Sequence, residues 1–181
     1  MIKKFDKNWM SPIVSGKKYG NNSMIEHPIE PVFDQNSRIL ILGSFPSVKS
    51  REVKFFYGHP KNRFWKVIAA VYGEKAPDSI EEKKSFLLRN HIAVWDVIKS
   101  CDIEGSADSS IKNVVPNDLN RILNQAEIEH IFLNGKKAEQ LYKKYMEKEI
   151  NRKAECLPST SPANAAWSLK RLVEEWKKIL L

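Results

Sequence analysis

The sequence predicts an α/β protein: a three-layer α/β/α sandwich around a short, mainly parallel four-stranded sheet. Four short apolar runs rich in branched side chains are typical of strands buried on both faces. Helical patterns lie between these runs, and strands that alternate with helices build parallel sheets. Because ligands bind beyond the carboxyl ends of such strands, a site is expected in the loops that follow them.

The strands come from the apolar runs themselves. They are expected at 38–43 (RILILG), 92–98 (IAVWDVI), 130–135 (HIFLNG) and from residue 154, where the chain then breaks into a polar loop through 165. Gly43 and Gly135 each end a run. Residues 26–37 (EHPIEPVFDQNS), which contain Pro28 and Pro31, are predicted to be an extended connection.

The helices follow from apolar spacing and capping residues. Apolar residues recur at helical spacing between Asn62 and Gly73. Ser79 and Glu82 have the spacing of a capping box, which predicts a helix over 79–91. Residues 105–119 are predicted to be a loop. Three further helices are predicted, from Pro116 through Gln125, over 136–150 and over 169–180.

Length and composition predict one domain over 27–181, preceded by a basic extension over 1–26. No apolar run is long enough for a membrane span, and the basic start has no apolar core of a signal peptide. Cys101 and Cys156 form no CxxC motif and are expected to stay reduced in a cytoplasm. The net charge of +8 favours a polyanionic partner, although solubility alone also explains it.

The stretch 55–65, FFYGHPKNRFW, combines aromatic rings, positive charge and one amide. Rings stack bases, cations contact phosphates, and amides hydrogen-bond to base edges. The chain lacks the GxSxG motif of esterases and the GxxxxGK[ST] loop that binds nucleotide phosphates, and its four His residues have no metal-site spacing. The aromatic rings, cations and amide that remain suit an enzyme that extracts a base from DNA.

Three stretches resemble motifs of the uracil-DNA glycosylase superfamily: 41–65 (ILGSFPSVKSREVKFFYGHPKNRFW), 105–119 (GSADSSIKNVVPNDL) and 157–165 (LPSTSPANA). Within it the chain is most similar to the hypoxanthine-DNA (deoxyinosine) glycosylase branch, called family six. The resemblance implies a monofunctional DNA repair enzyme that hydrolyses the N-glycosidic bond of a deaminated base. No cofactor and no metal are expected, because the chain has no Cys or His cluster. The protein is expected to be a monomer that acts on DNA with a deaminated base in the cytoplasm, at the nucleoid.

The resemblance also implies roles for individual residues. Phe45 stands where other branches hold an Asp or Asn that positions water, and Leu157 stands where uracil-specific members hold a His. Asn62 is therefore the expected catalytic residue, with a helix cap as its alternative. Tyr57 is expected to stack on the extruded base, or else to be a core ring. The full expected set is Ser44, Phe45, Tyr57, His59, Asp108, Ser109 and Asn134 for the base, and Lys61, Arg63, Ser159, Ser161, Ala163 and Asn164 for DNA.

Other functions remain open from the sequence. The same rings and cations suit a uracil or mismatch-specific glycosylase of the superfamily. They also suit a non-catalytic module that binds damaged or single-stranded nucleic acid. A hydrolase or transferase of free nucleosides is a third reading.

Overall fold

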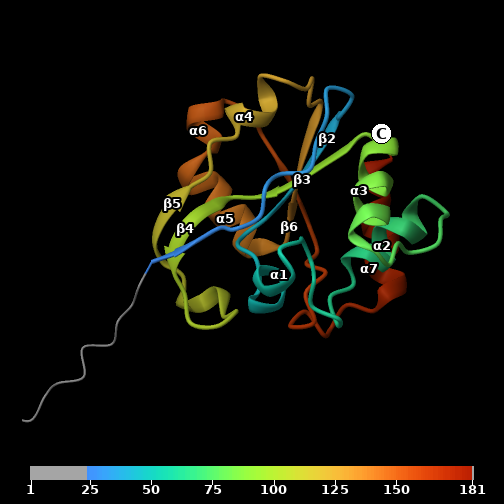
Figure 1. The fold of residues 1–181 in the computed structure, drawn as a ribbon, viewed down its shortest axis with the longest axis horizontal. Helices are drawn as coiled ribbons and strands as arrows, with labels where there is room; N and C mark the ends of the chain where they lie inside the picture. The colour runs from blue at the N-terminus through green and yellow to red at the C-terminus, as the bar shows by residue number, and fades with distance from the viewer. Residues whose placement is uncertain (1–23, 181) are drawn as a thin grey trace, which may run out of the picture.

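The computed structural model describes residues 24–180 (Figure 1). Its centre is a four-stranded sheet in the order β3-β2-β6-β7, and all three neighbouring pairs are parallel. The strands are β2 (Ile39–Gly43), β3 (Ile92–Asp96), β6 (His130–Asn134) and β7 (Glu155–Leu157). Every residue of β2 and β3 is buried, because both faces of the sheet are covered. The predicted parallel sheet is confirmed.

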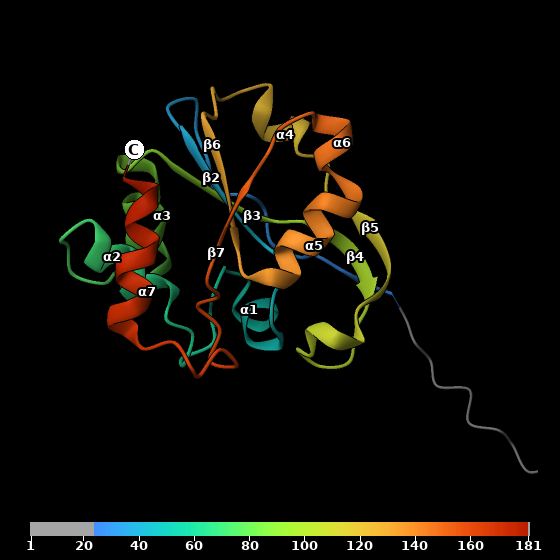
Figure 2. The same ribbon diagram turned by 180° about the vertical axis from the view of Figure 1, so that it is seen from behind.

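Helices cover the two faces of this sheet (Figures 1 and 2). One side holds α2 (Phe64–Val71), α3 (Ile80–Arg89) and α7 (Leu169–Trp176), which continues into the short turn η2 (Lys177–Ile179). The other side holds α5 (Lys136–Tyr145) and α6 (Glu147–Ile150). Ser79 and Glu82 form the predicted capping box of α3. The three-layer α/β/α arrangement is therefore also confirmed.

A second, antiparallel sheet was not predicted. It has the order β1-β4-β5 and consists of β1 (Ile25–Glu26), β4 (Ile98–Asp102) and β5 (Lys112–Pro116). The expected loop over 105–119 contains β5, which is too exposed to show an apolar alternation. The expected strand over 92–98 ends at Asp96, and Val97 separates it from β4.

Short helices differ most from the prediction. Pro116 ends β5 instead of starting a helix, and the helix that follows is only α4 (Asn120–Leu123). Two polar pieces, α1 (Val48–Val53) and the 3-10 turn η1 (Asp108–Ser110), carry too few apolar residues to be recognised as helices. The basic residues 1–23 lie outside the described part of the chain, and β1 falls just before the expected boundary at 26. No helix among residues 24–180 is long and apolar enough to cross a membrane.

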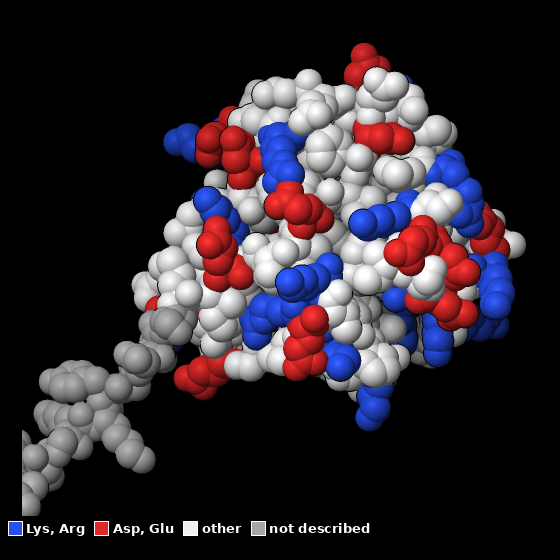
Figure 3. Space-filling view, viewed as in Figure 1, with Lys and Arg blue, Asp and Glu red and all other residues white. Residues whose placement is uncertain are grey.

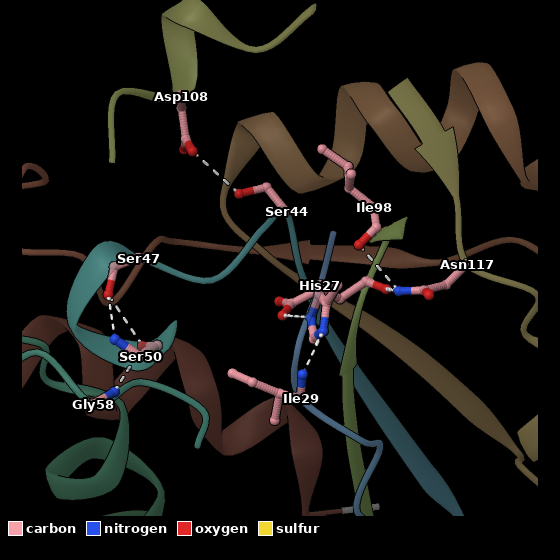
Figure 4. A network of polar contacts seen from close by, with 10 residues as sticks. His27, Ile29, Ser44, Ser47, Ser50, Gly58, Ile98, Asp108 and Asn117 are labelled. Carbon is pink, nitrogen blue, oxygen red and sulfur yellow. Dashed lines mark hydrogen bonds and ion pairs between the residues drawn. The ribbon is translucent and has the colours of Figure 1, made fainter. Parts of the chain in front are cut away.

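The loops that follow the parallel strands gather at one edge of the molecule, the lower edge in Figure 1. Gly135 follows β6 with φ of +96°, and a Cβ there would lie 2.9 Å from Cβ of Ser159. A glycine at this position therefore lets the loop after β7 close over the end of β6. Ser50 of α1 accepts a hydrogen bond from the N–H of Gly58 at 2.9 Å, which ties α1 to the aromatic stretch (Figure 4).

Candidate active site

A cavity of about 350 Å³ opens at this edge of the sheet. It falls within the size range of small-molecule pockets. Its walls come from segments that are distant in sequence: the loop after β2, the aromatic stretch, the end of β3, η1 and the loop after β7. The expected residues that line it are Ser44, Phe45, Tyr57, His59, Asn62, Asp108, Asn134, Ser159, Ser161 and Ala163.

Tyr57 forms an aromatic wall of the cavity. Its ring stacks on Phe64, with centroids 3.9 Å apart and an interplanar angle of 20°. Phe64 is fully buried, so it backs one face of Tyr57 with a rigid support. Tyr57 has φ of +52°, an uncommon conformation for a bulky residue that aims its side chain into the cavity. Burial, and to a lesser degree the charge of Asp96, raises the pKa of the Tyr57 phenol, so the ring stays neutral.

Asn62 has its side-chain oxygen fully engaged. Oδ1 accepts one hydrogen bond from the N–H of Phe64 and another from the hydroxyl of Thr160, each at 2.9 Å. These two donors identify the oxygen, so Nδ2 is the atom that remains, and it makes no hydrogen bond to the described residues. Arg63 is the N-cap of α2, so the bond from Asn62 to the N–H of Phe64 is an Asx turn just before the helix and not the N-cap bond. An amide N–H₂ of Asn62 is still free at the cavity.

Thr160, which the sequence analysis missed, joins two of the expected residues. Its hydroxyl donates to Asn62 and accepts from Nδ2 of Asn134 at 3.0 Å, and its N–H donates to Oδ1 of Asn134 at 3.0 Å. Thr160 is fully buried. Because Asn134 uses both side-chain atoms on Thr160, it anchors the loop after β7. One amide hydrogen and one oxygen lone pair of Asn134 remain, and the residue lines the cavity, so its contact with a base edge stays a prediction.

Arg63 does not extend toward solvent as a phosphate contact. Its guanidinium donates to the backbone carbonyls of Ser161 at 2.9 Å, Asn164 at 3.0 Å and Thr160 at 3.5 Å, and also to that of Trp167. This corrects the expected role, because a guanidinium that holds four carbonyls has few donors left for DNA. Arg63 instead fixes the shape of the loop over 160–167.

A buried carboxylate that the sequence analysis also missed lies at the floor of the cavity. Asp96 ends β3, and its Oδ2 lies 2.6 Å from Nε2 of His27. Gly43 lines the same floor, and a Cβ at that position would collide with Oδ1 of Asp96 and lie 3.3 Å from the hydroxyl of Tyr57. A glycine is thus required where the carboxylate and the phenol approach the backbone of β2.

The η1 turn contributes a second carboxylate at the mouth. Ser44 donates a hydrogen bond to Oδ1 of Asp108 at 3.3 Å (Figure 4). Desolvation raises the pKa of the Asp108 carboxyl, although the residue itself is exposed. Ser109, expected to bind the base, does not line the cavity; Ser106 from the same loop does. His59 lines the cavity, and its Nδ1 accepts from the N–H of Lys61 at 3.1 Å, as in a turn.

The loop after β7 is suited to phosphate groups. Oγ of Ser159 accepts from the N–H of Ser161, and Oγ of Ser161 accepts from the N–H of Ala163. Both hydroxyl hydrogens remain available as donors. Asn164 is tied back to the carbonyl of Ser159 at 2.9 Å, which leaves exposed Ala163 as the tip.

Basic and acidic side chains are interspersed over the face seen in Figure 3 and form no continuous basic patch there. Residues 1–23 hold five of the 30 basic residues and one of the 22 acidic ones, a net +4 of the total +8. Within the described part of the chain, no group of three His, Cys, Asp or Glu is placed to hold a metal ion.

Comparisons with known proteins agree on one family. The family model for the uracil DNA glycosylase superfamily matches residues 30–180. A protein named hypoxanthine DNA glycosylase from Methanosarcina acetivorans is 36% identical over 158 residues, which cover 86% of this chain and 98% of that protein. Another of that name from Methanosarcina barkeri is 36% identical over 110 residues, which cover 60% of this chain and 70% of that protein.

A solved structure is also similar to this chain and points to the same family. The solution NMR structure of a Methanosarcina acetivorans protein, described as a candidate uracil DNA glycosylase, superposes with a TM-score of 0.72 at 30% identity. The match covers 88% of this chain and all of the other. With the parallel sheet and the cavity at its carboxyl edge, these matches show that the chain belongs to the uracil DNA glycosylase superfamily.

Proposed function

We propose that this protein is a monofunctional DNA glycosylase that removes hypoxanthine from deoxyinosine in DNA and leaves an abasic site. The observation that carries the proposal is the pairing of a supported aromatic wall, Tyr57 on Phe64, with the free amide of Asn62 in one cavity. Two relatives named hypoxanthine DNA glycosylase support the choice of base. The enzyme acts as a monomer in the cytoplasm, on nucleoid DNA.

Stacking accounts for capture of the base. A base rotated out of the duplex loses its neighbours in the helix and regains a stacking partner on Tyr57, worth about 1–3 kcal/mol. Phe64 keeps the ring from moving away, since it is buried directly behind it. An aromatic face accepts purines as readily as pyrimidines, so this wall suits hypoxanthine.

Asn62 is proposed to orient the attacking water. As the bond between C1′ and N9 breaks, its electron pair leaves with the base and the sugar becomes oxocarbenium-like. Nδ2 of Asn62 donates to one lone pair of the water, and the other lone pair attacks C1′. The proton released from the water then goes to the departing base, which balances the hydrolysis. Since the sugar cation is strongly electrophilic, the water needs orientation more than it needs a strong base.

The loop after β2 is proposed to stabilise the departing base. Ser44 and Phe45 line the cavity directly after Gly43, where their backbone N–H groups can approach a base carrying negative charge. Phe45, which is only 8% exposed, adds an apolar wall and supplies no group that could position water. Ser159, Ser161 and Lys61 hold the flanking phosphates, and Ala163 enters the space that the base vacates.

The test is excision from a duplex with a single deoxyinosine, followed by alkali, which breaks the strand at abasic sites. We expect strand breaks that require the protein and that are absent from the matched duplex with adenine. Free deoxyinosine should stay intact, which would separate the enzyme from a nucleoside hydrolase. Tight binding without strand breaks would refute the proposal and indicate a non-catalytic binding module.

A further inference from the structure

The pair formed by His27 and Asp96 is one of the most deeply buried polar features near the cavity, and the mechanism above does not use it. The side chains are 2% and 5% exposed, and Oδ2 of Asp96 lies 2.6 Å from Nε2 of His27. Nδ1 of His27 accepts a hydrogen bond from the N–H of Ile29 at 3.1 Å (Figure 4). A nitrogen that accepts carries no proton, so Nε2 is the protonated atom and donates to Asp96.

This arrangement fixes which oxygen of Asp96 faces the cavity. Oδ2 is held by His27, whereas Oδ1 lies over the Cα of Gly43 on the cavity floor. Among residues 24–180, no side chain or backbone group donates to Oδ1. Oδ1 is not one of the fully enclosed polar atoms, and Asp96 lines the cavity, so this oxygen can accept a hydrogen bond from a ligand that enters. A carboxylate oxygen accepts hydrogen bonds and donates none.

The chemistry of deamination determines what such an acceptor selects. A base enters the cavity with its sugar outermost, so the N1 and C6 atoms of a purine go deepest. In adenine N1 is an acceptor, whereas in hypoxanthine N1 carries a hydrogen and C6 carries a carbonyl. A fixed carboxylate oxygen at the floor therefore attracts hypoxanthine and repels the N1 lone pair of adenine.

We propose that Asp96 is a specificity-determining residue that accepts the N1–H of hypoxanthine through Oδ1, and that His27 is the positioning residue that orients it. The inference rests on the proposed function, since it assigns the base-reading group of the same cavity. The interaction distinguishes a deaminated purine from its parent by the direction of a single hydrogen bond. Uracil and xanthine carry an equivalent ring N–H next to a carbonyl, so the same acceptor serves them when they reach the floor.

The decisive variant is Asp96→Asn, which keeps the shape of the side chain. His27 continues to donate to the amide oxygen, so the amide N–H₂ faces the cavity. This N–H₂ and the N1–H of hypoxanthine are both donors, so they cannot form a hydrogen bond. Binding is measured on duplexes that carry a non-hydrolysable 2′-fluoroarabino deoxyinosine, the matching adenine analogue, or a tetrahydrofuran abasic site. Affinity for the inosine duplex should fall roughly 10- to 100-fold, the scale of one hydrogen bond to a charged group. Affinity for the abasic duplex should not change.

Controls separate recognition from folding and from the function itself. His27→Gln keeps an N–H donor and should retain most of the preference for inosine over adenine, whereas His27→Ala should lose it. A second test uses the wild-type protein and a duplex with N1-methyl deoxyinosine. Methylation removes the N1–H donor, so this duplex should bind as weakly as the one with adenine. Equal affinity for methylated and unmethylated inosine would overturn the inference, as would an unchanged preference in Asp96→Asn. Failure of the wild type to bind or excise deoxyinosine at all would instead overturn the proposed function.

Discussion

Replacement of Asn62 by Ala should lower both stability and rate, by amounts that the structure sets separately. Oδ1 accepts two hydrogen bonds, from the N–H of Phe64 and the hydroxyl of Thr160. At about 1 kcal/mol for each bond, their loss should cost about 2 kcal/mol of unfolding free energy. For a chain of this size, that corresponds to a fall in Tm of about 4–8 °C. Loss of Nδ2 should slow the chemical step by about 10²–10³-fold, the scale for one positioned polar group.

The assay is single-turnover excision from a deoxyinosine duplex, with a melting curve of the same preparation. Ser79→Ala is the matched control, because Ser79 caps α3 away from the cavity and its loss should cost about 1 kcal/mol without a change in rate. If Asn62→Ala melts lower but excises at the wild-type rate, Asn62 is only a structural residue and the reasoning about its amide is wrong.

Four further outcomes are expected. Deoxyinosine should be excised faster than uracil in a panel of single-lesion duplexes, because Phe45 and Leu157 replace the groups that serve uracil; equal rates would contradict this. Activity should be unchanged in EDTA, and loss on chelation that added metal restores would reveal a metal site. Lys61→Ala should flatten the dependence of log DNA affinity on log salt concentration, because a phosphate contact is lost. Arg63→Ala should mainly lower Tm, because the Arg63 guanidinium binds backbone carbonyls of the loop over 160–167. A flatter salt dependence from Arg63→Ala alone would reverse these assignments. Asp108→Asn should raise Tm at pH 7, because the raised pKa of Asp108 means that ionising this carboxyl destabilises the folded state. Below pH 4 the carboxyl is protonated in both the folded and the unfolded state, so the gain in Tm should vanish there. A gain that persists in acid would show that ionisation of Asp108 is not its cause.

The elements that the sequence predicted well are those whose signal is local. The strands β2, β3 and β6 are continuous apolar runs, and α3 begins with a capping box that lies within four residues. β5 could not be predicted in the same way, because its residues are mostly exposed and it is held by pairing with β4. Local pattern therefore identifies what is buried on both faces and misses what depends on a partner strand.

The same limit applies to the cavity. Asn62 and Tyr57 could be found because they stand in an unusual stretch of 11 residues, 55–65. Thr160 was missed because its role depends on Asn62, 98 positions earlier. His27 and Asp96 are separated by 69 positions, and each stands in an ordinary context, a Pro-rich connection and the end of a strand. The functions of such residues are set by contacts that only the folded chain creates.

The left-handed backbone of Tyr57 has a consequence for laboratory evolution. A non-glycine residue in that conformation costs about 1–2 kcal/mol, whereas the aromatic pair with Phe64 is worth about 0.5–1.5 kcal/mol beyond burial. The two nearly cancel, and the buried hydroxyl of Tyr57 has no hydrogen-bond partner in the described part of the chain, which is a further cost. Selection for thermal stability alone would therefore act weakly on this ring and would favour Phe over Tyr. Libraries selected only for heat resistance should accumulate changes at position 57, while those also selected for excision should keep an aromatic ring there.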